Sequence, residues 1–106
     1  MPFLRVSVSK EVPETKKKEL LKTWSSLIAR QLGKPESYMM TLFSPSVPMT
    51  FGGSDAPSAF IEIKSIGALS SSNCTALTKN LCQSLEKELG IAPDRTYIEF
   101  TDVKAS

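Results

Sequence analysis

No histidine occurs among the 106 residues of this chain. Catalytic triads that use histidine as the general base are therefore excluded, and so are ordinary zinc sites. Cysteine is almost as scarce, because Cys74 and Cys82 are the only two and their spacing is not that of a metal knuckle. The only glycine pair, Gly52-Gly53, lacks the lysine or third glycine of a phosphate-binding loop. We therefore expect no metal and no cofactor, and any catalysis must use amine, carboxylate, hydroxyl or backbone groups.

Neither sign of charge dominates the sequence. Lysine and arginine number 13 and aspartate and glutamate 11, so the net charge of +2 gives no indication of nucleic-acid binding. The one basic run, at 16–18, lies between Glu14 and Glu19, which is typical of the solvated start of a helix. Hydrophobic residues make up 41% of the chain, as in ordinary globular proteins, and we predict a single domain over residues 1–106.

The sequence shows no secretory leader and no membrane-spanning run. Its first residues become charged at Arg5 and Lys10, so we expect neither export by a signal peptide nor membrane association. Cys74 and Cys82 fall eight residues apart in a predicted helix. That spacing separates their backbones by roughly 12 Å, whereas a disulfide needs less than about 7 Å. A reducing, cytoplasmic location fits this pattern.

The chain reads as two similar halves, each with a strand, a helix and a strand. In the first half, Phe3–Val8 alternates between apolar and polar residues, which predicts a strand. Apolar residues then recur at helical spacing from Pro13 to the stop signal Gly33, and Tyr38–Phe43 is the second predicted strand. The second half repeats this order, with a strand at Ala59–Ser65, a helix from the cap candidates Ser70–Asn73 to Gly90, and a strand at Thr96–Thr101.

Two such units, at about 2–45 and 58–101, predict an α+β two-layer sandwich. With right-handed crossovers they form a four-stranded mixed sheet that carries both helices on one face. The opposite face is polar, since charged residues interrupt three of the four strands at alternate positions: Arg5, Glu62, Lys64 and Glu99. Either this face meets solvent in a monomer or it lines a wet cavity inside an oligomer, and we favour the oligomer.

Proline is the second residue, and removal of Met1 would leave Pro2 as a free secondary amine. An α-amino group titrates at about 7.7–8.0 in water, and burial together with a nearby cation lowers that pKa. A base poised near the working pH is what proton abstraction beside a carbonyl requires. Pro2 is therefore the leading candidate for a catalytic base, on the condition that Met1 is removed, because the nitrogen of an internal proline is an amide.

Several short segments carry a family resemblance. They are Met1-Pro2-Phe3, Leu32-Gly33-Lys34-Pro35 with Tyr38, Phe51-Gly52-Gly53-Ser54, Lys64-Ser65-Ile66-Gly67 and Pro93-Asp94-Arg95-Thr96-Tyr97-Ile98. In this order, over essentially the whole chain, they resemble the macrophage migration inhibitory factor family, which includes D-dopachrome tautomerase. The resemblance implies a homotrimer whose sheets surround a solvent channel, with active sites between subunits. It also implies an isomerase that catalyses keto–enol tautomerisation of phenylpyruvate-like or dopachrome-like substrates.

Carried over by position, the resemblance makes Pro2 the catalytic base and Lys34 the cation that binds the substrate's carboxylate. Ile66 would contribute a backbone N–H group and a hydrophobic wall, and Tyr97 of a neighbouring subunit would close the pocket. Three further residues are expected to border it: Phe3, Ser65 and Glu99. The alternative is a leaderless, cytokine-like signalling protein that is secreted to meet a cell-surface receptor and keeps only a vestigial pocket.

The sequence also departs from the family pattern. Better-known cytokine members have a Cys-x-x-Cys where this chain has Ser58-Ala59-Phe60-Ile61, so a thiol-oxidoreductase activity is not supported. Ser46 replaces an acidic residue that some relatives use for receptor contact, and Glu99 replaces a common asparagine, which we expect to disfavour an anionic substrate. The chain stops at Lys104-Ala105-Ser106 without the Gly-Trp tail of its relatives. From this we expect a more open pocket, weaker substrate binding and a less stable trimer.

Overall fold

The computed structural model describes residues 2–104, so the expectations that concern removal of Met1 and the chain's last two residues lie outside the described residues. The main elements are β1 (Phe3–Val8), α1 (Glu14–Leu32), β2 (Met40–Ser44), β3 (Ala59–Ser65), α2 (Ser71–Leu89) and β4 (Thr96–Asp102). Two short 3-10 helices, η1 (Glu36–Tyr38) and η2 (Pro93–Arg95), precede β2 and β4. Within residues 2–104, neither long helix is apolar enough to cross a membrane.

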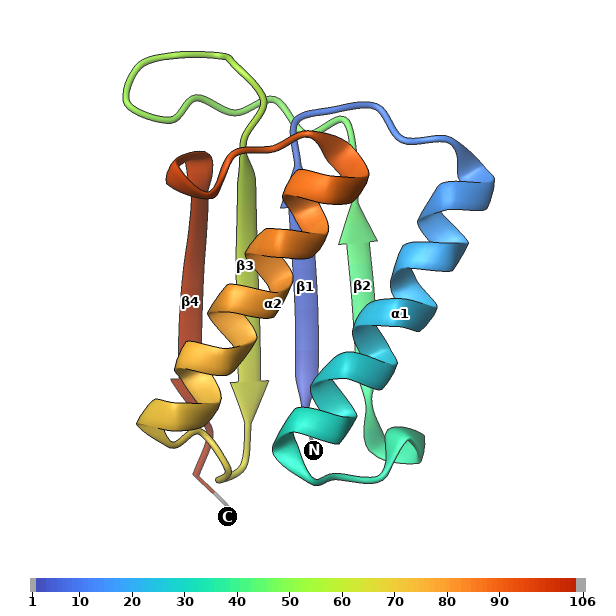
Figure 1. The fold of residues 1–106 in the computed structure, drawn as a ribbon, viewed down its shortest axis with the longest axis vertical. Coiled ribbons are helices and arrows are strands. Elements are labelled where there is room, and N and C mark those ends of the chain that lie inside the picture. The colour runs from blue at the N-terminus through green and yellow to red at the C-terminus, as the bar shows by residue number, and fades with distance from the viewer. Residues whose placement is uncertain (1, 105–106) are drawn as a thin grey trace.

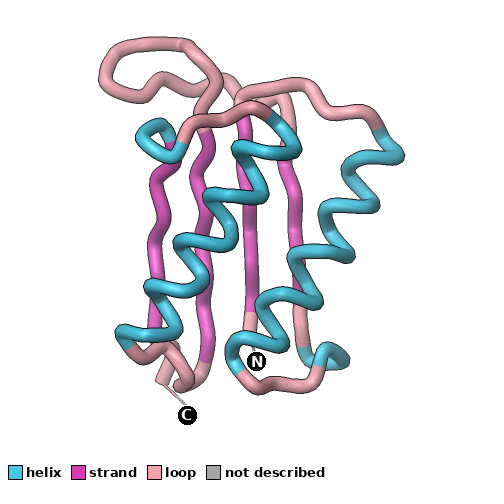
Figure 2. The backbone as a smooth tube through the Cα atoms, in the orientation of Figure 1, coloured by secondary structure: helices cyan, strands magenta, loops and turns pink. Residues whose placement is uncertain are grey.

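The four strands form one sheet in the order β2-β1-β3-β4, and both helices cover the same face of it (Figure 1). The outer pairs, β1–β2 and β3–β4, are parallel, whereas the central pair β1–β3 is antiparallel. The chain therefore consists of two βαβ units whose first strands, β1 and β3, pair side by side in the sheet, as the backbone trace in Figure 2 also shows. The predicted two-layer α+β fold with a mixed sheet is confirmed.

Four element boundaries differ from the sequence prediction. Tyr38 belongs to η1 and not to a strand, because its N–H donates to the Pro35 carbonyl at 3.1 Å and closes a tight turn, so β2 begins only at Met40. The same strand ends at Ser44, one residue later than predicted. Pro13 is the N-cap of α1 and lies outside the helix, which starts at Glu14. The last strand extends one residue beyond its predicted end, to Asp102.

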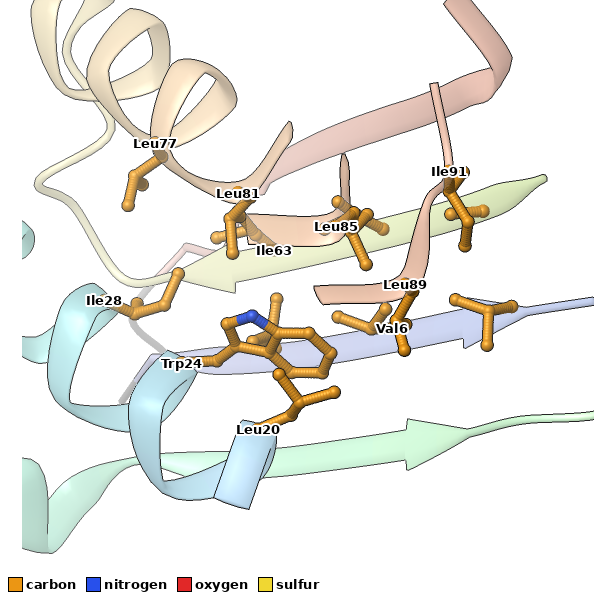
Figure 3. Packing of buried hydrophobic residues seen from close by; sticks show 14 of the residues in the cluster. Val6, Leu20, Trp24, Ile28, Ile63, Leu77, Leu81, Leu85, Leu89 and Ile91 are labelled. Carbon is orange, nitrogen blue, oxygen red and sulfur yellow. The ribbon is translucent and has the colours of Figure 1, made fainter. Parts of the chain in front are cut away.

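The core lies between the sheet and the two helices (Figure 3). Trp24 is fully buried at its centre and meets the Phe43 ring edge-on, with ring centroids 5.1 Å apart. Its indole N–H donates to Ser84 Oγ at 3.0 Å, which joins α1 to α2. Alternate residues of the central strands complete the core: Leu4, Val6, Val8, Ala59, Ile61 and Ile63.

The other face of the sheet carries the polar residues that the sequence predicted. Arg5 Nε on β1 lies 2.5 Å from Glu62 Oε2 on β3, and the Lys64 ammonium lies 6.0 Å from the centre of the Phe3 ring. Large apolar side chains are exposed at both edges of this face, and Tyr97 on β4 is 60% exposed. A single chain thus leaves a mixed polar and apolar face without a covering layer.

Arg95 fastens the long loop between β2 and β3 to the start of β4. Its guanidinium donates hydrogen bonds of 2.8–3.2 Å to the carbonyl oxygens of Phe51, Ser54, Ala56 and Pro57 and to Ser58 Oγ. It also lies 5.5 Å from the centre of the Phe51 ring. The Arg95 side chain therefore provides hydrogen bonds to four loop carbonyls that lie outside the helices and strands.

The basic run at 16–18 has a partner on the second helix. Lys16 Nζ on α1 pairs with Glu88 Oε2 on α2. The hydrogen bond from Lys16, together with its charge, holds the pKa of Glu88 below its ordinary value of 4.5, and the same bond raises the pKa of Lys16 above 10.5. The basic run is therefore not only a solvated helix start.

Glu88→Gln is expected to lower the melting temperature slightly at neutral pH. The stabilisation by Glu88 is present above its ordinary pKa of 4.5 and is lost as the pH falls through the lower value of the folded state. The difference between wild type and variant should therefore shrink in acid, and also in high salt, because the pair lies near the surface. Thermal melts by circular dichroism measure it, with Glu86→Gln on the exposed face of α2 as the control. A difference that grows on acidification would contradict the assignment.

Candidate active site

The candidate site lies at one end of the sheet, where the central strand β1 begins and the central strand β3 ends. Because these strands are antiparallel, the start of one lies beside the end of the other. The turn after α1 reaches the same end of the sheet, at the bottom of Figure 1 near the N-terminus. The fold therefore brings together Pro2, Lys34, Ser65 and Ile66, which the sequence predicted to share a site.

Pro2 is fully buried at the start of β1. Its carbonyl oxygen accepts the N–H of Met40 at 3.2 Å, so β2 holds it from one side. Leu4 is buried against the helices, and Pro2 has the same parity along the strand, which places its ring on the helix-covered face. Phe3 lies between them on the open face, under the Lys64 ammonium.

Lys34 reaches the end of β3 from the turn after α1. Gly33 ends the helix with a φ of 65°, in the left-handed region that favours glycine. The chain then turns so that the Lys34 N–H donates to the Ala29 carbonyl at 3.0 Å. The Lys34 ammonium donates to the Ile66 carbonyl oxygen at 3.4 Å. The fold thus places the Lys34 ammonium beside Ile66, which is 40% exposed, at this end of the sheet.

The segment after β3 is held by the end of β4, through a residue that the sequence reasoning missed. Asp102 accepts the N–H of Gly67 on its carboxylate at 3.0 Å, and the Val103 N–H donates to the Ser65 carbonyl at 2.8 Å. The sequence contains no local signal for Asp102, because its partner Gly67 lies 35 positions away. A last strand predicted to continue to residue 102 would have brought it to the same end of the sheet.

Tyr97 and Glu99 lie away from Pro2 within one chain. Tyr97 pairs with Phe60, and its ring centroid is 5.7 Å from that of Phe60. Phe60 precedes Ser65 by five residues, or about 17 Å along β3. Glu99 pairs with Glu62 in the middle of the open face. A chain on its own therefore does not close a pocket around Pro2 with its own Tyr97.

A surface hollow of about 860 Å³ lies at the other end of the sheet, lined by Ser9, Glu11, Val47 and neighbouring loop residues. None of the predicted site residues lines it. The candidate site is therefore identified by the chemical groups of Pro2 and Lys34 at their end of the sheet, and not by the size of a hollow.

The fold defines a class of proteins with two βαβ units in one mixed sheet, in which a buried proline starts the first strand and a lysine reaches the same end of the sheet. The family model of macrophage migration inhibitory factor matches residues 1–106. The chain belongs to the macrophage migration inhibitory factor family.

Individual relatives agree with this assignment. The chain is 36% identical to a macrophage migration inhibitory factor homolog of Brugia malayi, over all of this chain and 91% of that protein. It is 35% identical to the macrophage migration inhibitory factor of Meriones unguiculatus over the same shares. Among solved structures, the homologue from Prochlorococcus marinus superposes with a TM-score of 0.92 at 41% identity, covering 97% of this chain and 90% of that one. The Toxoplasma gondii protein gives a TM-score of 0.90 at 33% identity, covering 96% and 90%.

Proposed function

We propose that this protein is a keto–enol tautomerase that acts on aromatic α-keto acids such as phenylpyruvate, or on dopachrome-like substrates. The observation that carries the proposal is the convergence of two residues at one end of the sheet: Pro2 is buried opposite the end of β3, and the Lys34 ammonium binds the Ile66 carbonyl directly after that strand. In the reaction, the Pro2 nitrogen takes a proton from the carbon beside the keto group. The C–H electrons form the C=C bond while the C=O π electrons move to the oxygen, which takes a proton from water. Pro2 then returns its proton to water, so the net reaction is an isomerisation without a co-reactant.

The surroundings of Pro2 suit a base that works near neutral pH. Burial disfavours the charged form of the amine, and a nearby ammonium group disfavours it further. Both effects lower the pKa of the free amine from the ordinary range of about 7.7–8.0. Lys34 has two roles in this proposal, because it binds the substrate's carboxylate and helps to keep the amine neutral.

The proposed site is completed in a homotrimer. Tyr97 is 60% exposed and lies too far along the sheet to reach its own Pro2, so a neighbouring copy of the chain would supply it. The open face, with Arg5, Glu62 and Glu99, would line the channel between the subunits. Glu99 follows Tyr97 by two residues on this face, where its carboxylate would disfavour an anionic substrate and shift the preference among substrates.

The direct test is a phenylpyruvate tautomerase assay on protein whose intact mass shows that Met1 has been removed. We expect activity from this protein and none from the same chain with Met1 retained. Activity that is equal in both forms would overturn the role of the amine. A protein that is inactive in both forms would favour the alternative of a signalling protein with a vestigial pocket.

Lys34→Ala is expected to lower kcat/KM for phenylpyruvate by about 10–100-fold, mostly through a higher KM, because a charge-assisted hydrogen bond to the carboxylate is lost. Lys18→Ala, at an exposed position on α1, is the matched loss of one positive charge and should leave the kinetics unchanged. Steady-state kinetics on the processed proteins provide the measurement. An unchanged KM in Lys34→Ala would show that this lysine does not bind the carboxylate.

A further inference from the structure

A buried hydroxyl without a partner lies at the candidate site. Ser65, the last residue of β3, is fully buried, and its Oγ makes no hydrogen bond among the described residues. The backbone carbonyl of Ser65 is bound by the Val103 N–H at 2.8 Å, so the residue is fixed in place. Most buried polar groups in native proteins are hydrogen-bonded, because leaving one unpaired costs free energy. The Ser65 hydroxyl therefore needs a partner that residues 2–104 do not supply in this state.

The sheet register places this hydroxyl beside Pro2. β1 and β3 pair Phe3 with Lys64, so one further step pairs Pro2 with Ser65. The Pro2 carbonyl accepts the Met40 N–H on the β2 side, which makes Pro2–Ser65 a pair without mutual backbone hydrogen bonds. In such antiparallel pairs the Cα atoms lie only about 4.5 Å apart, and the side chains approach most closely. Both side chains are buried, so they share the helix-covered face.

We propose that Ser65 is a positioning residue for the Pro2 amine, a role that rests on the proposed function. While Pro2 is joined to Met1, its nitrogen is a tertiary amide with neither an N–H nor an available lone pair. Once Met1 is removed, the nitrogen is a secondary amine that has both. Donating its N–H to Ser65 Oγ gives the buried hydroxyl its partner and leaves the lone pair to take the substrate's proton.

The same hydrogen bond strengthens as the reaction proceeds. When the substrate's proton moves to nitrogen, the amine becomes a charged donor, and hydrogen bonds from charged donors are roughly twice as strong as neutral ones. Ser65 therefore stabilises the protonated Pro2 that forms during proton transfer. Burial and Lys34 act in the opposite direction, so the working pKa of the amine is a balance between these influences.

The test titrates the amine itself. In protein labelled with [15N]proline and lacking Met1, the nitrogen chemical shift of Pro2 follows its protonation independently of catalysis. Ser65→Ala should lower the titration midpoint by about 0.5–1 pH unit, because the protonated amine loses more than the neutral one. The acid limb of the kcat/KM profile for phenylpyruvate should shift equally, and kcat should fall about tenfold. Ser65→Thr keeps the hydroxyl and should restore the wild-type midpoint.

Thr41→Val is the matched control. Thr41 Oγ1 is the other buried side-chain oxygen without a hydrogen-bond partner among the described residues, and it pairs with Leu4 instead of Pro2. Its removal should leave the midpoint unchanged. A wild-type midpoint in Ser65→Ala, or an equal shift in Thr41→Val, would overturn the role of Ser65.

The result also separates this role from the proposed function. A shifted midpoint in a protein that shows no tautomerase activity would keep the Ser65–Pro2 contact and overturn the function. An active protein whose midpoint does not move in Ser65→Ala would do the reverse. If the alanine variant did not fold, Ser65→Cys would take its place, since a thiol of similar volume is a weaker acceptor and should give a partial shift.

Discussion

Replacing Pro2 with glycine, in protein that has lost Met1, is expected to lower kcat/KM for phenylpyruvate tautomerisation by at least about 100-fold. An amine remains in this variant, but it is a primary amine without the ring that burial holds at the start of β1. The nitrogen then rotates and becomes more exposed to water, so it loses both its orientation and the burial that keeps it neutral. Steady-state assays, with intact mass to verify removal of Met1, measure the effect.

Pro48→Gly is the control for this substitution. Pro48 lies exposed in the loop before β3, at the opposite end of the sheet, and the same change there should leave the activity intact. Equal rates for wild type and Pro2→Gly would remove Pro2 from the mechanism. The fold would stand, because the burial of Pro2 and the topology of the sheet do not depend on catalysis.

Trp24→Ala is expected to lower the free energy of unfolding by about 3–5 kcal/mol. Trp24 is fully buried between the two helices and the sheet, where it contacts the edge of Phe43 and donates a hydrogen bond to Ser84. Removing it leaves a large cavity and leaves Ser84 without its donor. Urea unfolding at fixed protein concentration measures the loss, since assembly would otherwise change the apparent stability.

Trp24→Phe divides this loss into its two parts. The smaller ring keeps most of the apolar contact with Phe43 but has no N–H for Ser84, so the variant should be less destabilised than Trp24→Ala. A loss below about 1 kcal/mol for Trp24→Ala would mean that the core rearranges to fill the space, contrary to this expectation.

The strands were predicted from the sequence where the alternation of residues was decisive. Phe3–Val8 and Ala59–Ser65 have the bounds that were predicted, because each has one buried face and one less buried face, and this difference produces the alternation of residues. Tyr38 was misplaced since its surroundings look like a strand, whereas a local hydrogen bond to Pro35 decides its conformation. Local bonds of this kind leave little signal in hydrophobic periodicity.

The site was predicted in part. Pro2 was identified from its position as the second residue, and Lys34 and Ile66 through the family resemblance; the fold brings them to one end of the sheet. Two features depend on how distant segments align and were not accessible from the sequence: Asp102 supporting Gly67, and the burial of Ser65 without a hydrogen-bond partner. Residue spacing along one strand reports its faces, but it does not report the register with which another strand pairs beside it.

The two βαβ units share an architecture, but the residues that precede their first strands have different surroundings. Each βαβ unit begins with a strand, and the residue before the second such strand is Ser58, the counterpart of Pro2. Ser58 is also buried, but it lies within the chain, so its nitrogen is an amide that donates to Ser9 Oγ at 3.0 Å while Arg95 binds its hydroxyl. A polypeptide has a single N-terminus, so only one of the two strand starts can carry a free amine, which is Pro2 once Met1 is removed. The other, Ser58, binds Arg95 and helps to hold the loop before β3.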